Sequence, residues 1–252
     1  KSQIFDLRRL FYLIRRQAVL QQNIILISAG AIFGVLLISN ALGVYFSSFL
    51  STEAFLGSVM PLFFIGGYLL SSRIFHELDN PQKGYLFLSL PASTLEKLIS
   101  GWLISGVFYV IFGWIIALIL NVAIYALGEF FFGASIELLG IFNNDLWVNM
   151  GVYLITHTLF ILGACYFTKH NFLKTLLTLF FIIMVIGIYS GIMGWIIFGD
   201  FNQAFTFDDE IDFESHMLFA DTIPDIARFF FHYLMAPFFL VVSYFRLKER
   251  QI

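Results

Sequence analysis

The chain has 252 residues, of which 60% are hydrophobic and only 12% are charged, and its mean hydropathy is +0.87. Soluble domains carry about 25% charged residues, so this composition excludes an ordinary soluble protein and predicts an integral membrane protein. The formal net charge of −3 gives no support for nucleic-acid binding as a main role.

The start of the chain, residues 4–17, is predicted to form an amphipathic elbow helix. Its apolar face would hold Ile4, Leu7, Leu10, Phe11 and Ile14, and its other face mostly Arg8, Arg9, Arg15 and Arg16. Such a helix suits the plane of an anionic leaflet of membrane lipid. The alternative is a juxtamembrane extension of the first span. The uncharged run at 18–52 exceeds the roughly 7–15 residues of a signal-peptide core and predicts a retained spanning helix.

Six apolar runs each reach or approach the roughly 20 residues that a helix needs to cross a bilayer core. They cover about residues 23–46, 55–74, 94–127, 146–167, 173–198 and 226–245. The sequence therefore predicts an all-α protein with a single transmembrane domain over 1–252.

Basic residues set the orientation of membrane proteins. Thirteen of the fourteen Lys and Arg residues lie in four segments: the N-terminal segment, the connections between spans two and three and between spans four and five, and the C-terminal segment. We expect these segments and both termini to face the cytoplasm, and only Arg228 to lie on the opposite side.

The connection between the second and third spans contains two helix-start signals. Asn80 followed by Pro81 has the pattern of an N-cap and a first helical residue, which predicts a short helix ending near Leu88. Ser93 and Glu96 have the spacing of a capping box, which predicts the start of the next long helix. A partner outside the membrane can contact and displace a short helix that lies across the end of a bundle.

The connection before the last span, residues 199–225, mixes aromatic and acidic side chains. This mixture predicts short external helices at the outer membrane surface. The acidic cluster from Asp208 to Glu214 lacks the glycine and the ligand spacing of a calcium-binding loop. We interpret it as a solvated acidic surface, with metal binding as the alternative.

The interiors of the spans carry few chemical signals. Gly30 with Gly34, and Gly187 with Gly191, are small-residue pairs that let helices pack closely, within one subunit or between two. No Asp, Glu, Lys or Arg lies in the middle of a span, which argues against an ion-coupled pump or secondary transporter. His157 and His232 are interpreted as hydrogen-bonded packing residues, with a proton relay as the alternative.

Signals for enzymes are weak. Ser190 and His232 suggest an intramembrane serine protease, but a rhomboid-like site would need glycine where this chain has Ile188. The single cysteine, Cys165, lies in an apolar run and is expected to be an inert thiol. No phosphate-binding Gly-x-x-x-x-Gly-Lys-Ser/Thr loop is present, so any ATP chemistry belongs to another polypeptide.

The arrangement of elbow, six spans and internal termini, with the segment Leu-Ser-Leu-Pro-Ala-Ser-Thr-Leu-Glu-Lys at 88–97, resembles the membrane subunit of ABC exporters of the type-2 permease family, the type V exporter fold. The resemblance implies a permease subunit in the bacterial inner membrane, surrounded by lipid. It would pair with a second permease subunit, as a homo- or heterodimer, and with a cytoplasmic ABC ATPase subunit. ATP and Mg would bind to that ATPase, so no catalytic, cofactor-binding or metal-binding residue is expected here.

The resemblance also implies roles for residues. The segment 76–93 would contain a coupling helix, with ATPase contacts at Asn80, Pro81, Lys83, Tyr85, Leu86 and Leu88. Ser93 and Glu96 would cap the junction with the third span. A substrate pathway or dimer interface would include Phe63, Phe64, Tyr68, Gly187, Tyr189, Gly191 and Met193, for which core packing is the alternative.

Two other functions remain open at this stage. The chain could be a non-transporting anchor or assembly subunit of a larger complex, which the lack of midplane charge fits equally well. It could also be the intramembrane protease, which would require Ser190 for activity. An aromatic interior would suit a lipid, a peptide or a hydrophobic drug as substrate, and would equally suit a closed bundle with no conduit.

Overall fold

The structure, a computed structural model, describes residues 5–198 and 223–250 and is dominated by helices. In chain order the α-helices are α1 (Leu7–Ser47), α2 (Thr52–Arg73), α3 (Pro81–Leu88), α4 (Thr94–Trp102), α5 (Tyr109–Leu127), α6 (Asn144–Tyr166), α7 (Asn171–Phe198), α8 (Ile223–Phe229) and α9 (Met235–Glu249). The shorter elements are the 3-10 turn η1 (His76–Asp79), the π-helical turns η2 (Leu103–Phe108), η3 (Gly128–Phe132) and η6 (Phe230–Leu234), and the strands β1 (Phe49–Leu50) and β2 (Ser135–Ile136).

Six helical segments of the described chain are long and apolar enough to cross a membrane, as predicted. They are Ile25–Ser47, Thr52–Arg73, Thr94–Phe132, Asn144–Tyr166, Asn171–Met193 and Asp225–Glu249. The third is the longest because α4, η2, α5 and η3 follow one another without a break.

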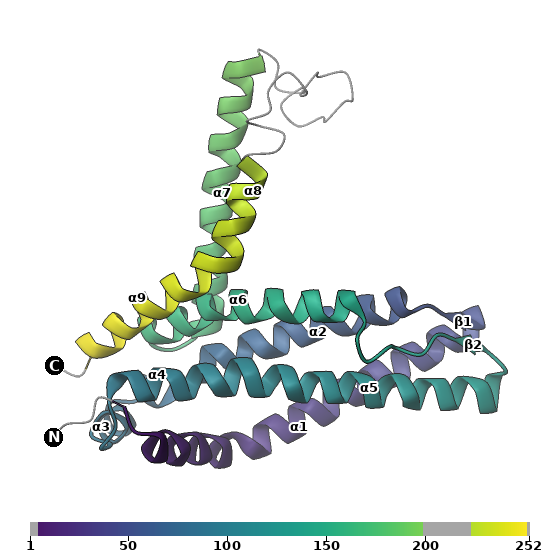
Figure 1. The fold of residues 1–252 in the computed structure, drawn as a ribbon, viewed down its shortest axis with the longest axis horizontal. Helices are drawn as coiled ribbons and strands as arrows, with labels where there is room; N and C mark the ends of the chain where they lie inside the picture. The colour runs from purple at the N-terminus through teal and green to yellow at the C-terminus, as the bar shows by residue number, and fades with distance from the viewer. Residues whose placement is uncertain (1–4, 199–222, 251–252) are drawn as a thin grey trace.

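Four of these segments form an elongated bundle (Figure 1). Helices α1, α2 and α6 lie alongside the continuous α4–α5 segment. The start of α1, the end of α9 and α3 lie together at one end of the bundle, and the two strands lie at the other. There β1 pairs in parallel with β2, which ties the α1–α2 connection to the segment after η3.

Two clusters of buried apolar side chains hold the bundle together. The larger lies among α1, α2, α5 and α6 and includes Phe55, Leu120 and Tyr153. The smaller includes Phe87 of α3 and combines side chains of α3, α4, η2, α6 and α9 with two from the turn after α2: Ile74, Phe75, Phe87, Leu98, Ile104, Ile161, Ala164, Cys165 and Leu247. Cys165 is thus buried, as expected for a thiol that packs.

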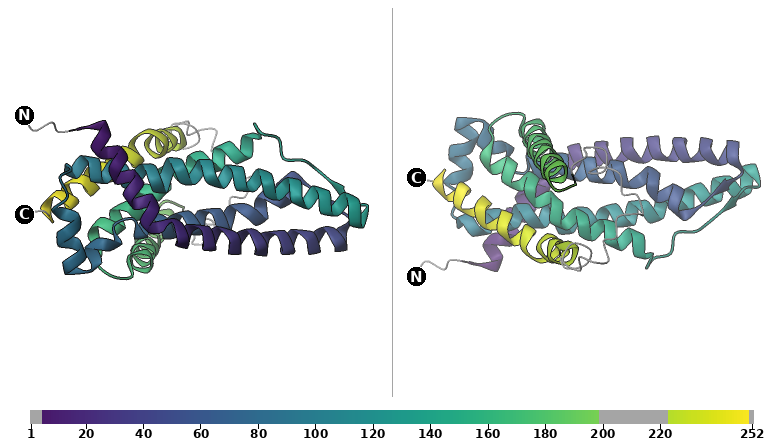
Figure 2. Two further views of the ribbon diagram at one scale, coloured as in Figure 1. Left: turned by 90° about the horizontal axis from the view of Figure 1, so that it is seen from below. Right: turned by 90° about the horizontal axis from the view of Figure 1, so that it is seen from above.

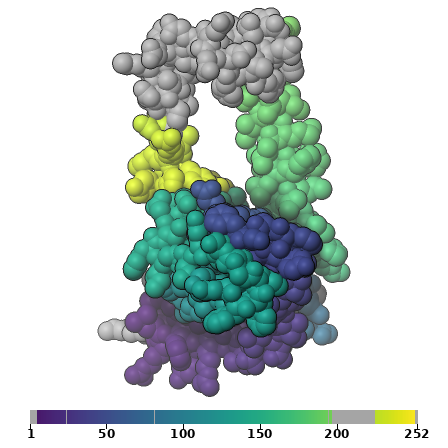
Figure 3. Space-filling view, turned by 90° about the vertical axis from the view of Figure 1, so that its right-hand side faces the viewer, coloured from purple at the N-terminus to yellow at the C-terminus, as the bar shows by residue number. Residues whose placement is uncertain are grey.

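Helices α7 and α8 run across the long axis of the bundle (Figure 1) and project from it as separate arms (Figure 3). Spanning helices in membranes tilt by no more than about 40° from the bilayer normal. All six segments can therefore cross one flat bilayer only if α7 and α8 turn toward the bundle axis. The connection before α7 contains two residues with left-handed backbone, Lys169 (φ 60°) and His170 (φ 52°).

The predicted elbow differs from the structure. No break separates it from the first span, because α1 is one continuous helix of 41 residues. Figure 2 shows the N-terminal part of α1 at an angle to the remainder. The expected division of its faces is wrong in part: Leu10 is buried while Phe11 is exposed, and Arg9 and Arg16 form ion pairs within the protein.

Candidate functional site

The short helix predicted in the connection between the second and third spans is present as α3. The Asn80 side chain caps it by accepting a hydrogen bond of 3.0 Å from the backbone N–H of Gln82. Pro81 lies in its first turn, where a missing N–H costs nothing. Local sequence signals therefore suffice to place this helix.

The two sides of α3 differ in exposure. Tyr85 and Leu86 are 75% and 64% exposed, and Lys83 is exposed with them. On the opposite side Phe87 is buried against Phe75, with ring centroids 6.1 Å apart. Of the expected ATPase contacts, Asn80 also lies exposed, whereas Leu88 is half-buried next to the small core cluster.

The capping box at the start of α4 is also present. The Ser93 hydroxyl accepts from the Glu96 N–H at 3.2 Å, and the Glu96 carboxylate accepts from the Ser93 N–H at 2.8 Å. Next to it, the buried Lys97 donates from Nζ to the Leu88 carbonyl at 2.8 Å. A cation at the C-terminal end of a helix is favourable, so Lys97 fastens the end of α3 to the start of α4.

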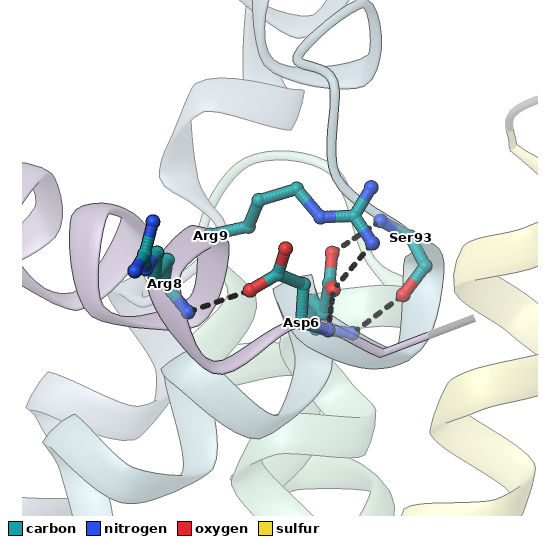
Figure 4. Close-up of polar contacts among 5 residues, drawn as sticks. Asp6, Arg8, Arg9 and Ser93 are labelled. Carbon is teal, nitrogen blue, oxygen red and sulfur yellow. Dashed lines mark hydrogen bonds and ion pairs between the residues drawn. The ribbon is translucent and has the colours of Figure 1, made fainter. Parts of the chain in front are cut away.

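Glu96 does more than cap its helix. Its fully buried carboxylate also accepts from the backbone N–H of Asp6 at 2.7 Å and lies 3.1 Å from the Arg9 guanidinium. Figure 4 shows Arg9 extending toward the turn that carries Ser93. One carboxylate thus joins the start of α1 to the start of α4.

Two further contacts brace the same connection. Arg16 of α1 donates to both carboxylate oxygens of Glu77, at 3.0 and 2.7 Å. The Asp79 carboxylate accepts from the backbone N–H of Lys169 at 3.3 Å and from the Asn171 amide at 3.5 Å. The segment that carries α3 is therefore bound both to α1 and to the connection before α7.

The residues expected to line a pathway fall into two separate groups. Phe63 is buried in the large core cluster and Tyr68 is half-buried, stacked on Phe160 with centroids 4.3 Å apart; Phe64 lies between them and packs on both. The other group lies on α7, where Tyr189 and Gly187 are exposed and Met193 is partly exposed. Gly191, in the same helix, is buried.

Sequence reasoning missed the residue at the centre of the first group. Tyr153 of α6 is fully buried, packs against Phe63 and Tyr68, and donates its hydroxyl to the Ser105 carbonyl at 2.5 Å. Gly67 of α2 lies against its ring, where any side chain would collide. A tyrosine in an apolar run gives no sequence signal for this position.

The residues of the weaker sequence signals, His157, His232 and Ser190, lie in different surroundings. His157 is buried, with Nδ1 3.1 Å from the Tyr153 carbonyl, and its ring stacks on Tyr153. His232 contacts the Arg228 carbonyl at 2.9 Å, one turn back in its own helical segment. Ser190 is exposed on α7.

The acidic cluster and the external helices expected over 199–225 lie almost entirely outside the described residues. Within 5–198 and 223–250, no group of three or more His, Cys, Asp or Glu side chains is arranged to hold a metal ion. The described residues that combine an exposed surface with bracing contacts are those of α3 and its neighbours. No protein-family model, curated protein or solved structure matches this chain.

Proposed function

We propose that this chain is the membrane-spanning permease subunit of an ATP-driven ABC exporter, paired with a second permease subunit and with separate cytoplasmic ATPase subunits. The observation that carries the proposal is the geometry of α3. This helix exposes Tyr85 and Leu86 on one side and is held on the other by Phe87 and Lys97. A helix that is exposed on one side and anchored on the other can bind a partner and transmit the partner's movement to the bundle.

The bracing contacts supply a route for that displacement. Lys97 links α3 to α4, Glu96 links α4 to α1, and Asp79 links the same connection to the start of α7. An ATPase dimer that closes more favourably in one membrane conformation would shift the bundle toward that conformation through these links.

The filled interior of the bundle bears on the pathway. Phe63 and Tyr153 pack at its centre, so a single chain offers no room for a substrate there. In the proposed exporter the substrate would pass between two permease subunits. Tyr189 and Met193, which α7 exposes, are better candidates for lining that route than Phe63.

The proposed orientation can be tested with single cysteines. Tyr85→Cys on α3 and Phe142→Cys at the opposite end replace exposed side chains. With both termini in the cytoplasm, we expect a membrane-impermeant maleimide to label Phe142→Cys in intact cells and Tyr85→Cys only in inverted vesicles. The buried Cys165 should stay unlabelled in both, and the reverse pattern would contradict the orientation.

The proposed docking helix can be tested by purification from native membranes. We expect an ABC ATPase to co-purify with the wild-type chain. The double variant Tyr85→Ala/Leu86→Ala should recover at least tenfold less ATPase, because two exposed apolar contacts are removed. A matched control, Ile141→Ala/Phe142→Ala, removes exposed apolar side chains at the other end of the bundle and should retain the ATPase. Failure of the wild-type chain to recover any ATPase would end the exporter proposal.

The filled interior also favours a second candidate, a non-transporting anchor or assembly subunit. The same purification separates the two functions, because an anchor would bring down partners without an ABC ATPase. The protease alternative has less support: His232 contacts the Arg228 carbonyl, and Ser190 lies exposed on α7. It would require that Ser190→Ala abolish a proteolytic activity of the purified chain.

A further inference from the structure

The four arginines at the start of α1 sort into two pairs with different surroundings. Arg9 and Arg16, seven residues apart, turn toward the protein and pair with Glu96 and Glu77. Arg8 and Arg15, also seven residues apart, lie about 100° around the helix from that pair and are exposed. Figure 4 shows the Arg8 side chain directed away from Arg9 and Ser93.

The exposed side combines charge with aromatic surface. Phe11 and Tyr12 lie between Arg8 and Arg15 and are 63% and 64% exposed. Two helical turns separate the arginines, a rise of about 10.5 Å at 1.5 Å per residue. We call Arg8, Phe11, Tyr12 and Arg15 the outer α1 face.

The positive charge of this face is not neutralised by the described protein. No ion pair joins Arg8 or Arg15 to a carboxylate within residues 5–198 and 223–250. Glu96 and Glu77 pair with the inner arginines. Asp6 accepts the backbone N–H of Arg8 at 2.8 Å and is a nearby negative charge, so the two outer arginines outnumber this one carboxylate.

The face lies just before the first candidate membrane span of the chain. Helix α1 runs unbroken into the first candidate span, which begins at Ile25. Arg15 precedes that residue by ten positions, about 15 Å along the helix. Aromatic rings are favoured at the depth of the lipid headgroups, and basic side chains are attracted to anionic lipid there.

We propose that the outer α1 face is a binding site for the headgroup of an anionic phospholipid in the adjacent leaflet. The guanidinium groups of Arg8 and Arg15 would pair with phosphate oxygens, for which guanidinium has matching geometry. The rings of Phe11 and Tyr12 would lie among the headgroups and upper acyl chains. The site does not depend on whether the chain exports a substrate.

The two arginine pairs provide matched variants for a test. Arg8→Gln/Arg15→Gln and Arg9→Gln/Arg16→Gln remove the same charge from the same helix, one pair from the outer face and the other from ion pairs. The purified full-length chain in neutral detergent is titrated with phosphatidylglycerol or phosphatidylcholine, and bound lipid is counted by native mass spectrometry. Unfolding temperatures are measured in parallel.

We expect the wild-type chain to prefer phosphatidylglycerol and the outer-pair variant to bind it about thirtyfold more weakly, from the attraction of two basic side chains to an anionic surface. The unfolding temperature of that variant should stay close to wild type. The inner-pair variant should keep its lipid affinity within threefold while melting at a lower temperature. Inorganic phosphate should not displace the lipid, because it lacks the acyl chains that keep the headgroup at the interface.

Three results would overturn the proposal. One is an outer-pair variant with wild-type affinity for phosphatidylglycerol, and another is an equal loss in both variants, which would indicate a general charge effect. The third is an outer-pair variant that retains lipid but loses a co-purifying protein, since the face would then dock a protein partner.

Discussion

Replacing Glu96 with alanine is expected to lower the free energy of unfolding by about 3 kcal/mol, the cost of removing one partner from a buried charge network. The wild-type carboxylate is fully buried and accepts hydrogen bonds from the N–H groups of Asp6 and Ser93. In the variant these donors and the Arg9 guanidinium would lose their acceptor. Thermal unfolding in detergent, followed by size-exclusion chromatography, measures the loss.

A second ion pair of the same connection serves as the control. The side chains of Arg16 and Glu77 are 35% and 15% exposed, so water can solvate either partner when the other is removed. Glu77→Ala should therefore cost about 1 kcal/mol or less. In the proposed exporter, Glu96→Ala should also uncouple ATP hydrolysis from transport in liposomes. If Glu96→Ala melted and coupled ATP hydrolysis to transport like the wild type, the contacts of Glu96 would neither stabilise the fold nor transmit movement of the ATPase.

The helix starts around α3 could be predicted from the sequence because caps are local. Asn80 reaches the N–H of Gln82, and Ser93 exchanges bonds with Glu96 three residues later. The six long apolar segments were predictable for a similar reason, since length and composition within one helix decide whether it can cross a bilayer.

The contacts that brace α3 could not be predicted from the sequence. Asp6 and Glu96 are 90 positions apart, and Arg16 and Glu77 are 61 apart. Pairing over such distances depends on how the helices pack, and the chain offers many alternative carboxylates. The capping box showed one role of Glu96, but no local pattern indicates that its second oxygen holds the start of α1.

The sequence did not predict which side chains of α1 face the protein and which face outward. The first turns of α1 carry arginines at both inward and outward positions, so composition alone assigned all four to the membrane surface. Arg9 and Arg16 differ from Arg8 and Arg15 only by one position in the helical rotation. That rotation of about 100° per residue places the former pair next to glutamates and leaves the latter exposed.

The second large effect on stability is expected at Tyr153, which packs among other aromatic side chains. Tyr153→Ala is expected to lower the free energy of unfolding by about 4 kcal/mol, because it leaves a cavity at a fully buried position. The Tyr153 ring packs against Phe63 and Tyr109, with centroids 5.1 and 5.3 Å away. Lost packing contacts carry the cost among helices that lipid surrounds, where water contributes little.

Tyr153→Phe is the matched control, since it keeps the ring and removes only the hydroxyl that donates to the Ser105 carbonyl. Hydrogen bonds between membrane helices contribute roughly 1 kcal/mol, so this variant should lose about a quarter of the alanine effect. The two variants also show whether the aromatic side chains around Tyr153 stabilise the fold or line a substrate pathway. If Tyr153→Ala melted like the wild type and instead changed which compounds the chain transports, the cluster of Phe63, Phe64 and Tyr68 would belong to the substrate pathway. A large loss of stability with unchanged selectivity in the folded fraction would assign the cluster to the core, and the route for substrate would then have to lie at the surface that two subunits share.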